Sequence, residues 1–381
     1  MKRIVLKIGT QVIIDPSGMA LRSDFLDLFV DLVGRLHRQG REVVVVSSGA
    51  VALGRGVLGL TGEIDLRQRQ ACAAIGQARL MHAYDQLLQR QQISCAQILL
   101  TGEDLASRRT YLHLKETFNT LLGWGVVPIV NENDSVSSAE LEVYAGKSFG
   151  DNDVLSALIA SKLQADLMIL LTSVDGIYRE APRAGQSGER LHLVEDVHQL
   201  SQVIVSEGTS LGRGGMASKL EAVRLAALCG VSVWVGQLAP LVALREPWQL
   251  TESSLASVGT LIAPQKVLRG RKKWIGGSAG YRGVITINAG ARVAVVEKRA
   301  SLLAIGIVDS QGQFVAGEIV SVHDELGREI ARGLARIGAH ELNTVIQQNR
   351  ENESPATSPS PIKHKSVVVV HRDDLAVFVK E

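Results

Sequence analysis

Six short runs of β-branched and other apolar residues, separated by longer helical patterns, constrain this fold more than any other feature of the sequence. The runs show no regular polar alternation, which is typical of strands buried on both faces of a sheet. They lie at residues 4–6, 43–46, 97–100, 126–130, 167–171 and 231–235. Strand–helix alternation of this kind predicts a mainly parallel sheet covered by helices on both faces, an open αβα sandwich of the α/β class.

The segments between these runs have apolar residues at the spacing of one helix face. In residues 24–39 the apolar side chains recur every three or four positions, Ser23 can cap the start and Gly40 can end the helix. Further helices are predicted at residues 67–91, 110–122, 154–163 and 216–229.

The pattern changes near Pro264, where short β-like pieces replace the strand–helix alternation. These pieces lie at residues 283–288, 292–296, 319–322, 367–370 and 376–379. Between them, residues 347–366 are polar and hold three of the nine prolines, so we expect a mobile Pro/Ser-rich loop. The sequence therefore predicts a first domain over residues 1–264 and a small β-rich domain over residues 270–381.

Composition excludes several classes of protein. Hydrophobic residues make up 46% of the 381 residues, enough for a packed core, which excludes a disordered chain. The net charge of +2 is too small to indicate a polybasic chain. Residues 1–268 hold 25 basic and 27 acidic residues, whereas residues 269–381 hold 16 basic and 12 acidic residues. Three cysteines without a CxxC pair indicate neither a zinc site nor a disulfide framework. With no apolar run of about 18 residues and no signal-peptide pattern, we expect a cytoplasmic protein.

Two glycine motifs match well-known signatures but lack the required context. Residues 54–59 read GxGxxG, yet they do not follow a strand directly and no acidic residue occurs at 66–84, so we interpret them as a flexible segment rather than an NAD site. Residues 276–280 read GxSxG, but β-like residues follow where a hydrolase needs a helix.

Glycine-rich or acidic segments gather at the predicted ends of four strands, the edge at which open α/β sheets bind ligands. They are Lys-Ile-Gly-Thr at 7–10, Ser-Ser-Gly-Ala at 47–50, Asn-Glu-Asn-Asp at 131–134 with Gly-Asp-Asn-Asp at 150–153, and Gly-Arg-Gly-Gly-Met-Ala-Ser-Lys at 212–219. The glycine turns that open into helices can place backbone amides around an anion.

The side chains of these segments suit phosphoryl transfer, which needs alignment and positive charge around the moving group. Lys7 and Lys219 could supply the charge, and Asp153 could orient them and hold Mg²⁺ through oxygen ligands or waters. The polar groups for the amino and carboxyl ends of a small substrate would come from Asn131, Asp134 and Asn152.

Each segment also has an ordinary structural interpretation. A lysine at a strand end is usually a solvated surface residue, residues 131–134 resemble a turn, and Asp151 or Asn152 can simply cap a helix. What favours a site is that all four segments fall at the same predicted edge of one sheet.

Taken together and in order, the segments resemble a known family. The motifs are KIGT at 7–10, SSGAVALG at 47–54, VPIVNENDSV at 127–136, GDNDVLSALIA at 150–160, LLTSVDGIY at 170–178 and GRGGMASKLEA at 212–222. They resemble the glutamate 5-kinases of the amino acid kinase family. RKKWI at 271–275 and HRDDLAVFV at 371–379 resemble the PUA domain that follows the kinase in many such enzymes, so the resemblance covers nearly the whole chain.

The resemblance implies transfer of the γ-phosphoryl of ATP to the side-chain carboxylate of L-glutamate, the first step towards proline. It implies that Lys7 and Lys219 contact the transferring phosphoryl and that Asp153 organises them and the Mg²⁺ environment. Glutamate would be bound by Ser48, Asp134 and Asn152, with Asn131 and Asp151 nearby. ATP would be bound by Lys7, Thr172, Ser173 and the stretch Arg213, Gly214, Gly215, Met216, Ala217, Ser218 and Lys219.

The sequence departs from the family pattern at three places, and the resemblance leaves other questions open. The family often has Asp at the position of Ser173 and Thr at the position of Arg213, which puts the nucleotide contact at these positions in question. The loop at residues 347–366 is also longer than expected. Relatives of this fold phosphorylate acetylglutamate, aspartate, carbamate or UMP, which are the alternative substrates. The resemblance further implies feedback inhibition by proline and a homo-oligomer.

A regulator that binds structured RNA through the PUA-like domain is the alternative from another class. The basic run at residues 269–273 and the surplus of positive charge after residue 268 point that way. We favour a solvated linker for this run, because the charge surplus is small for a nucleic-acid site.

Overall fold

The computed structural model describes residues 1–106, 108–136, 152–180, 188–202, 216–244, 250–265, 271–276, 281–352 and 367–378. The described residues form two compact units, the first ending at Gln265 and the second containing the residues from Arg271 on. Several residues singled out above therefore lie outside the described ones: Asp151, Arg213, Gly214, Gly215, 277–280 and 353–366.

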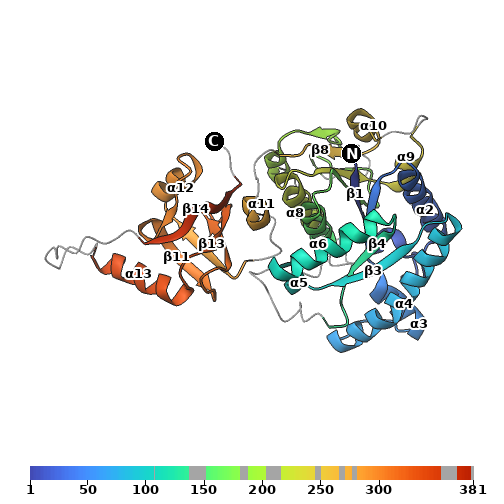
Figure 1. Ribbon diagram of the computed structural model, residues 1–381, viewed down its shortest axis with the longest axis horizontal. Helices are drawn as coiled ribbons and strands as arrows, with labels where there is room; N and C mark the ends of the chain where they lie inside the picture. Colours follow the sequence, from blue (N-terminus) through green and yellow to red (C-terminus); the bar gives the residue numbers. More distant parts are fainter. Residues whose placement is uncertain are drawn as a thin grey trace. The chain divides into compact units, whose positions relative to one another are not determined.

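In the first unit the described strands form one sheet of eight in the order β3-β4-β2-β1-β5-β7-β8-β6 (Figure 1). Neighbouring strands are parallel except β7 and β8, which run antiparallel. The strands are β1 (Arg3–Ile8), β2 (Glu42–Ser47), β3 (Cys95–Leu100), β4 (Val127–Glu132), β5 (Leu167–Leu171), β6 (Leu193–Val194), β7 (Ser232–Gly236) and β8 (Thr260–Ile262). The predicted mainly parallel sheet is confirmed, with β1 at its centre.

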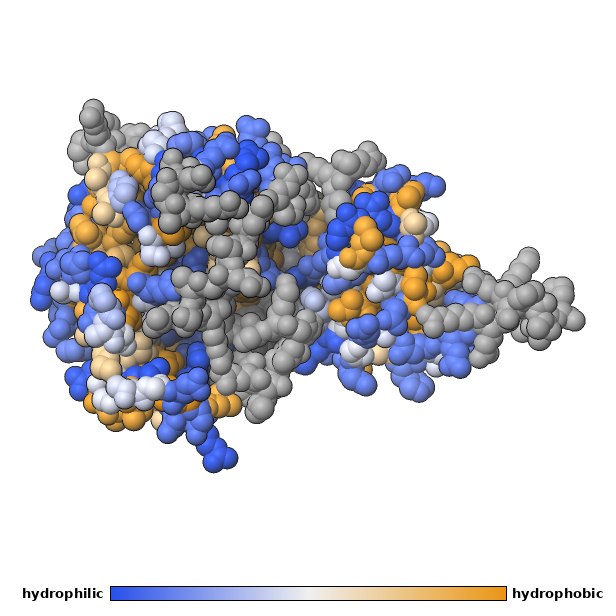
Figure 2. All heavy atoms as spheres, turned by 180° about the vertical axis from the view of Figure 1, so that it is seen from behind, coloured by the Kyte–Doolittle hydropathy of each residue, from blue (hydrophilic) through white to orange (hydrophobic). Residues whose placement is uncertain are grey.

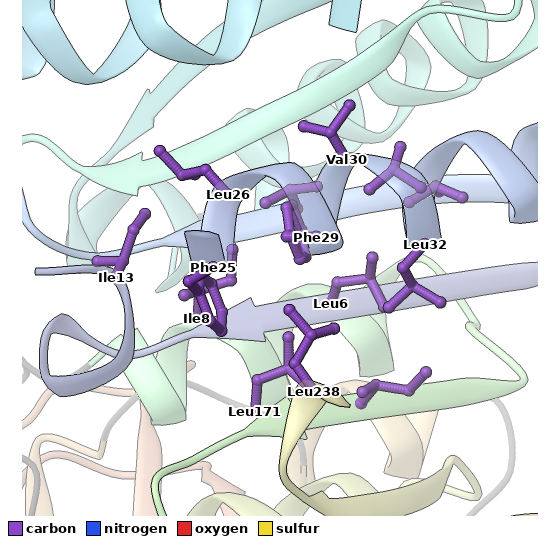
Figure 3. Packing of buried hydrophobic residues seen from close by; sticks show 14 of the residues in the cluster. Leu6, Ile8, Ile13, Phe25, Leu26, Phe29, Val30, Leu32, Leu171 and Leu238 are labelled. Carbon is purple, nitrogen blue, oxygen red and sulfur yellow. The ribbon is translucent and has the colours of Figure 1, made fainter. Parts of the chain in front are cut away.

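One face of this sheet carries the larger apolar core. Ile4, Leu6 and Ile8 alternate along β1 and pack against Phe25 and Phe29 of α2 (Ser23–Arg38), as Figure 3 shows. The same face is covered by α4 (Leu66–Arg90), α9 (Leu238–Val242) and α10 (Glu252–Val258). The cap predicted at Ser23 is wrong by one residue: Ser23 is the first residue of α2 and Arg22 takes the N-cap position, without a capping hydrogen bond from its side chain.

The opposite face is covered by α6 (Arg108–Gly123), α7 (Asn152–Lys162) and α8 (Met216–Leu228). Because successive side chains of a strand point to opposite faces, Val5 and Lys7 of β1 point to this side. The N-terminus of α7 meets the carboxyl ends of the strands, so strand parity alone directs Lys7 toward α7. The remaining helices of this unit are α1 (Thr10–Ile13), α3 (Ala50–Leu58), α5 (Gly102–Ala106) and the 3₁₀ turn η1 (Val197–Gln202).

The GxGxxG residues at 54–59 are not the flexible segment that the sequence analysis expected, since Gly54 and Gly56 lie inside α3. A Cβ on Gly54 would lie 1.9 Å from the carbonyl oxygen of Cys72 in α4, and a Cβ on Gly76 would lie 1.8 Å from the carbonyl oxygen of Ala50. The missing side chains let the backbones of α3 and α4 touch, so these glycines are packing residues.

The described strands of the second unit form a mainly antiparallel sheet in the order β10-β14-β13-β12-β9-β11, in which β9 and β12 are parallel. Their bounds are β9 (Gly283–Ile287), β10 (Leu302–Leu303), β11 (Ile307–Gly312), β12 (Ile319–His323), β13 (Glu329–Ala335) and β14 (Val368–Val377). The unit has its own apolar core and contains α11 (Arg271–Gly276), α12 (Ala289–Val296), α13 (Ala339–Asn352) and the turn η2 (Ala304–Gly306). The predicted β-rich second unit is confirmed.

Three details of the second unit differ from the expectation. Residues 292–296 are helical, because Asn288 caps α12 through the Ala291 amide at 2.8 Å and Val295 and Val296 are buried. The two strands expected at 367–370 and 376–379 are one strand, β14, whose pairing with β13 continues through a register shift. The segment expected as a loop from residue 347 begins inside α13, which continues to Asn352.

Among the described residues, none of the helices combines the length and apolar character that crossing a membrane requires. The view in Figure 2 shows hydrophilic side chains interspersed with apolar ones over both units.

We predict that Gly76→Ala lowers the free energy of unfolding by about 2 kcal/mol or more, because the new methyl group would force α4 away from α3. Urea unfolding measures the change. Gly123→Ala, at the end of α6, is the matched control: a Cβ there meets nothing within 4 Å, so stability should stay the same or rise by up to about 1 kcal/mol. Equal stability of the two variants would contradict the proposed packing role.

Candidate active site

Two lysines from distant parts of the chain meet at one buried carboxylate. Lys7 Nζ pairs with Oδ1 of Asp153, and Lys219 Nζ lies 3.2 Å from Oδ2 of the same side chain. Lys7 comes from β1, Asp153 from the first turn of α7 and Lys219 from α8, which packs beside α7. The structure thus brings together the three residues that the sequence analysis assigned to phosphoryl transfer.

The electrostatics of this triad follow from its burial. The Asp153 side chain is 0% exposed, while the side chains of Lys7 and Lys219 are 4% and 14% exposed. A buried carboxylate needs partners, and the helix N-terminus adds favourable partial positive charge. The triad itself holds one carboxylate against two ammonium groups, a surplus of positive charge that suits a polyanion.

Beside the triad, the amide of Asn152 joins three segments that the sequence analysis treated separately. Its Nδ2 lies 3.1 Å from the carbonyl oxygen of Ser47, 2.9 Å from Oγ of Ser48 and 2.9 Å from Oδ1 of Asn131. The segment after β2, the end of β4 and the start of α7 are therefore held together by one side chain. Three of the predicted substrate residues, Ser48, Asn131 and Asn152, are in direct contact.

Sequence reasoning missed a fourth member of this network, Gln77 of α4. Its Oε1 accepts a hydrogen bond of 2.8 Å from Nδ2 of Asn131, and the residue is only 8% exposed. A signal was present, because Gln77 lies on the stripe of α4 that also carries Ala73, Leu80 and Tyr84, all of which are buried. A polar residue on an apolar stripe is the pattern that would have found it.

The turn after β2 is built to present Ser48. Gly49 has φ of 109°, a left-handed conformation that favours glycine, and it starts α3 directly after Ser48. The hydroxyl of Tyr84 lies 2.8 Å from Oγ of Ser47 and anchors the strand end beneath the turn. Burial raises the pKa of Tyr84 well above its usual value, so this hydroxyl stays protonated and neutral.

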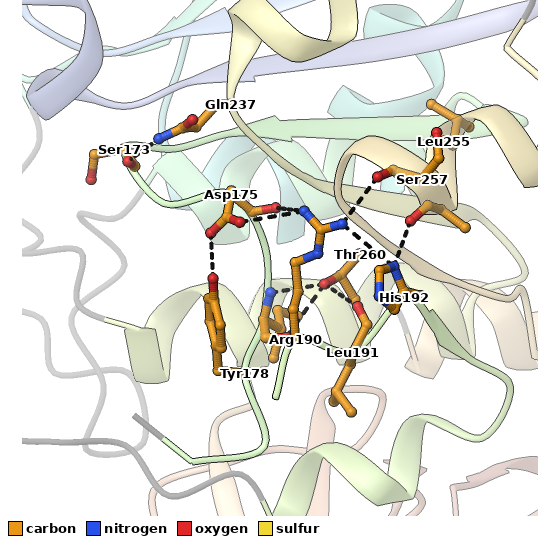
Figure 4. Close-up of polar contacts among 12 residues, drawn as sticks. Ser173, Asp175, Tyr178, Arg190, Leu191, His192, Gln237, Leu255, Ser257 and Thr260 are labelled. Carbon is orange, nitrogen blue, oxygen red and sulfur yellow. Dashed lines mark hydrogen bonds and ion pairs between the residues drawn. The ribbon is translucent and has the colours of Figure 1, made fainter. Parts of the chain in front are cut away.

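The segment after β5, which holds Thr172 and Ser173, is fixed by neighbouring side chains (Figure 4). Nε2 of Gln237, just after β7, donates a hydrogen bond of 2.7 Å to the carbonyl oxygen of Ser173. Further on, Asp175 accepts a hydrogen bond of 2.8 Å from the hydroxyl of Tyr178 and pairs with Arg190 at 3.3 Å. The predicted nucleotide segment is thus ordered at the same edge of the sheet as the triad.

The other predicted site residues have simpler placements. Asp134 lies half-buried in the turn after β4, and Met216, Ala217 and Ser218 form the first turn of α8, which carries Lys219. Asp151 and the residues Arg213, Gly214 and Gly215 lie outside the described residues. The described part of the site therefore runs from the end of β4 across β2 and β1 to β5.

Comparison with known proteins assigns the family. The model of the amino acid kinase family matches residues 2–237, well over half of the chain. The chain belongs to the amino acid kinase family. A PUA domain matches residues 283–352.

Relatives within this family match over nearly their full lengths. A protein named glutamate 5-kinase from Carboxydothermus hydrogenoformans is 38% identical over 381 residues, covering 99% of this chain and 97% of the relative. Glutamate 5-kinases from Syntrophotalea carbinolica and a Ruegeria species are 38% and 36% identical and also cover 99% of this chain, with 97% and 98% of their own lengths matched. The family resemblance inferred from the motifs is confirmed.

We predict that Asp153→Asn destabilises the protein by about 3–5 kcal/mol, because it removes the buried carboxylate that faces the ammonium groups of Lys7 and Lys219. Asp31→Asn is the control: Asp31 pairs with Arg35 at 2.9 Å on the surface of α2, where such a pair contributes about 0.5 kcal/mol. Urea unfolding at low ionic strength measures both, and a similar small loss in both variants would contradict the structural role of the triad.

Proposed function

We propose that this protein is an ATP-dependent kinase that phosphorylates the side-chain carboxylate of L-glutamate to give γ-glutamyl phosphate, the first step of proline biosynthesis. The observation that carries the proposal is the contact of Lys7 and Lys219 with Asp153, beside the Asn152 network, in a chain whose full-length relatives are named glutamate 5-kinase. The kinase domain spans residues 1–264 and the PUA-like domain residues 270–381 in this proposal.

The reaction needs charge and alignment more than acid–base chemistry. A carboxylate oxygen of glutamate forms a bond to the γ-phosphorus of ATP while the bond from that phosphorus to the β,γ-bridging oxygen breaks, and ADP leaves with the electron pair. The nucleophile is already ionised at neutral pH, so no general base is required. Lys7 and Lys219 would stabilise the charge on the transferring phosphoryl oxygens, and Asp153 would keep both ammonium groups in position.

The remaining residues divide between the two substrates. Ser48, Asp134 and Asn152 would bind glutamate, with Asn131 and Asp151 as further substrate residues. ATP would lie over Thr172 and Ser173 and over the stretch Arg213, Gly214, Gly215, Met216, Ala217 and Ser218 that leads to Lys219. Glycine turns running into a helix suit phosphates, because their backbone amides are free to point at the anion.

The described contacts of Asp153 are ion pairs with ammonium groups. Both oxygens of Asp153 face ammonium groups, and no cluster of three or more histidine, cysteine, aspartate or glutamate side chains occurs among the described residues. The sequence prediction that Asp153 also holds the metal therefore gains no support from these contacts, and every step above rests on the side chains of the protein.

We predict that the purified protein consumes ATP with glutamate and that hydroxylamine traps the product as the hydroxamate. Lys7→Ala and Lys219→Ala should each lower kcat by about 100-fold or more, because each removes one preorganised charge from the transition state. Lys298→Ala, at an exposed position of the second unit, is the control and should leave kcat unchanged.

A substrate panel tests the proposal further. Faster turnover of acetylglutamate, aspartate, carbamate or UMP than of glutamate would replace the proposed substrate, and unchanged kcat in both lysine variants would refute their roles. Adding proline to the same assay tests the feedback inhibition that we propose, and light scattering tests the proposed homo-oligomer. We further propose that the reaction takes place in the cytoplasm, and cell fractionation with an antibody tests this location.

The matched PUA domain favours RNA binding as a second function of the other unit. Residues 269–381 carry a surplus of four positive charges, so binding should be weak and should fall steeply with salt. Filter binding of a structured RNA at increasing salt concentrations measures it, and absent or salt-independent binding would exclude this function.

A further inference from the structure

The orientation of three amide side chains in the site is fixed by backbone groups at one side of the network. The Glu132 backbone N–H can only donate, and it lies 2.9 Å from Oδ1 of Asn131, so this atom is the acceptor. Nδ2 of Asn131 therefore faces Gln77, which must present Oε1 to it. In the same way, the carbonyl oxygen of Ser47 can only accept, which assigns Nδ2 of Asn152 to that contact.

In this fixed orientation, two buried polar atoms of the network have no hydrogen-bond partner among the described residues. They are Nε2 of Gln77 and Oδ1 of Asn152, and both atoms are shielded from solvent. Buried polar groups are almost always paired in folded proteins, so an unpaired donor and an unpaired acceptor in one network need an explanation. Exchanging the oxygen and nitrogen of either amide would break its contact to Asn131. A rotated amide therefore does not explain the unpaired atoms.

We propose that Gln77 binds the α-carboxylate of the amino-acid substrate through Nε2, while Oδ1 of Asn152 accepts a hydrogen bond from its α-ammonium group. This assignment rests on the glutamate kinase activity proposed above. The charges match, because a free α-amino acid carries one acceptor group and one donor group on the same carbon atom, and the network offers one donor and one acceptor. Gln77 is then a specificity-determining residue on a helix that none of the sequence motifs include.

The span of the site agrees with a five-carbon dicarboxylate. Lys7 lies on β1 and Asn131 on β4, with β2 between them, so their strands are about 10 Å apart. An extended glutamate places its two carboxyl carbons about 5 Å apart, and a hydrogen bond of about 3 Å at each end brings the reach to about 11 Å. One carboxylate can therefore lie at the lysines while the other lies at Gln77.

Gln77→Glu separates this role from a structural one. The introduced carboxylate retains an oxygen for Nδ2 of Asn131 but replaces the donor with a negative charge facing the substrate. We expect the KM for glutamate to rise by about tenfold or more, with the KM for ATP unchanged, since a hydrogen bond to a charged group is lost. Gln91→Glu, at the end of the same helix and in contact with Arg38, is the matched control and should leave both KM values unchanged.

The outcomes that overturn the inference are distinct from failure of the proposed function. A KM for glutamate within twofold of wild type in Gln77→Glu would assign Nε2 to an enclosed water, and a parallel rise in both KM values would make Gln77 a purely structural residue. Either result, obtained with an active wild-type enzyme, would contradict the role of Gln77 and leave the proposed kinase function intact. A wild-type protein that does not phosphorylate glutamate would contradict the proposed function as well.

A measurement on the wild type decides the question even when the variant does not fold. Glutamate should raise the thermal midpoint of the wild-type protein, whereas 4-aminobutyrate, which is glutamate without its α-carboxylate, should raise it much less at the same concentration. Equal shifts would mean that no side chain recognises the α-carboxylate, and the assignment of Gln77 would be wrong.

Discussion

The ion pairs of one buried carboxylate with two lysines are the constraint on which the rest of the site depends. Asp153 joins β1, α7 and α8, so the position of two helices on the sheet is tied to the position of two charges. Since a buried carboxylate is costly without partners, the fold keeps the lysines together before any nucleotide is bound. Charge that is held in place in advance needs no rearrangement during phosphoryl transfer.

Much of the first unit follows from the sequence because its strands are buried on both faces. Runs such as residues 43–46 contain only β-branched residues, and the helix at residues 24–39 has one apolar face, so each predicts its own structure. The second unit was harder to predict because its strands share no single burial pattern: β12 is buried almost throughout, whereas β11 is largely exposed. Residues 292–296 contain three valines and looked like a strand, but the Asn288 cap and the burial of Val295 and Val296 make them helical.

The site was predictable where its residues lie at strand ends or in the first turn of a helix, as Asp153 and Lys219 do, and not in the middle of a helix. Lys7, Ser48 and Asn131 stand at strand ends, a location that has functional meaning in any open α/β sheet. Gln77 lies in the middle of a helix, and only the contact with Asn131 shows its role. Gly54 was likewise ambiguous in sequence, because tight packing of two helices and a flexible loop both use glycine.

Asn152 and Asp153 are consecutive residues in the first turn of α7, and this adjacency joins two tasks in one rigid body. The side chain of Asn152 holds together the segments that we propose to bind the amino acid, and the side chain of Asp153 holds the ammonium groups that we propose to face the phosphates. A helix translates and rotates as a rod, so displacement of α7 would move the proposed amino-acid contacts and the lysine charges together. Any bound molecule that displaced this rod would change affinity and turnover at the same time.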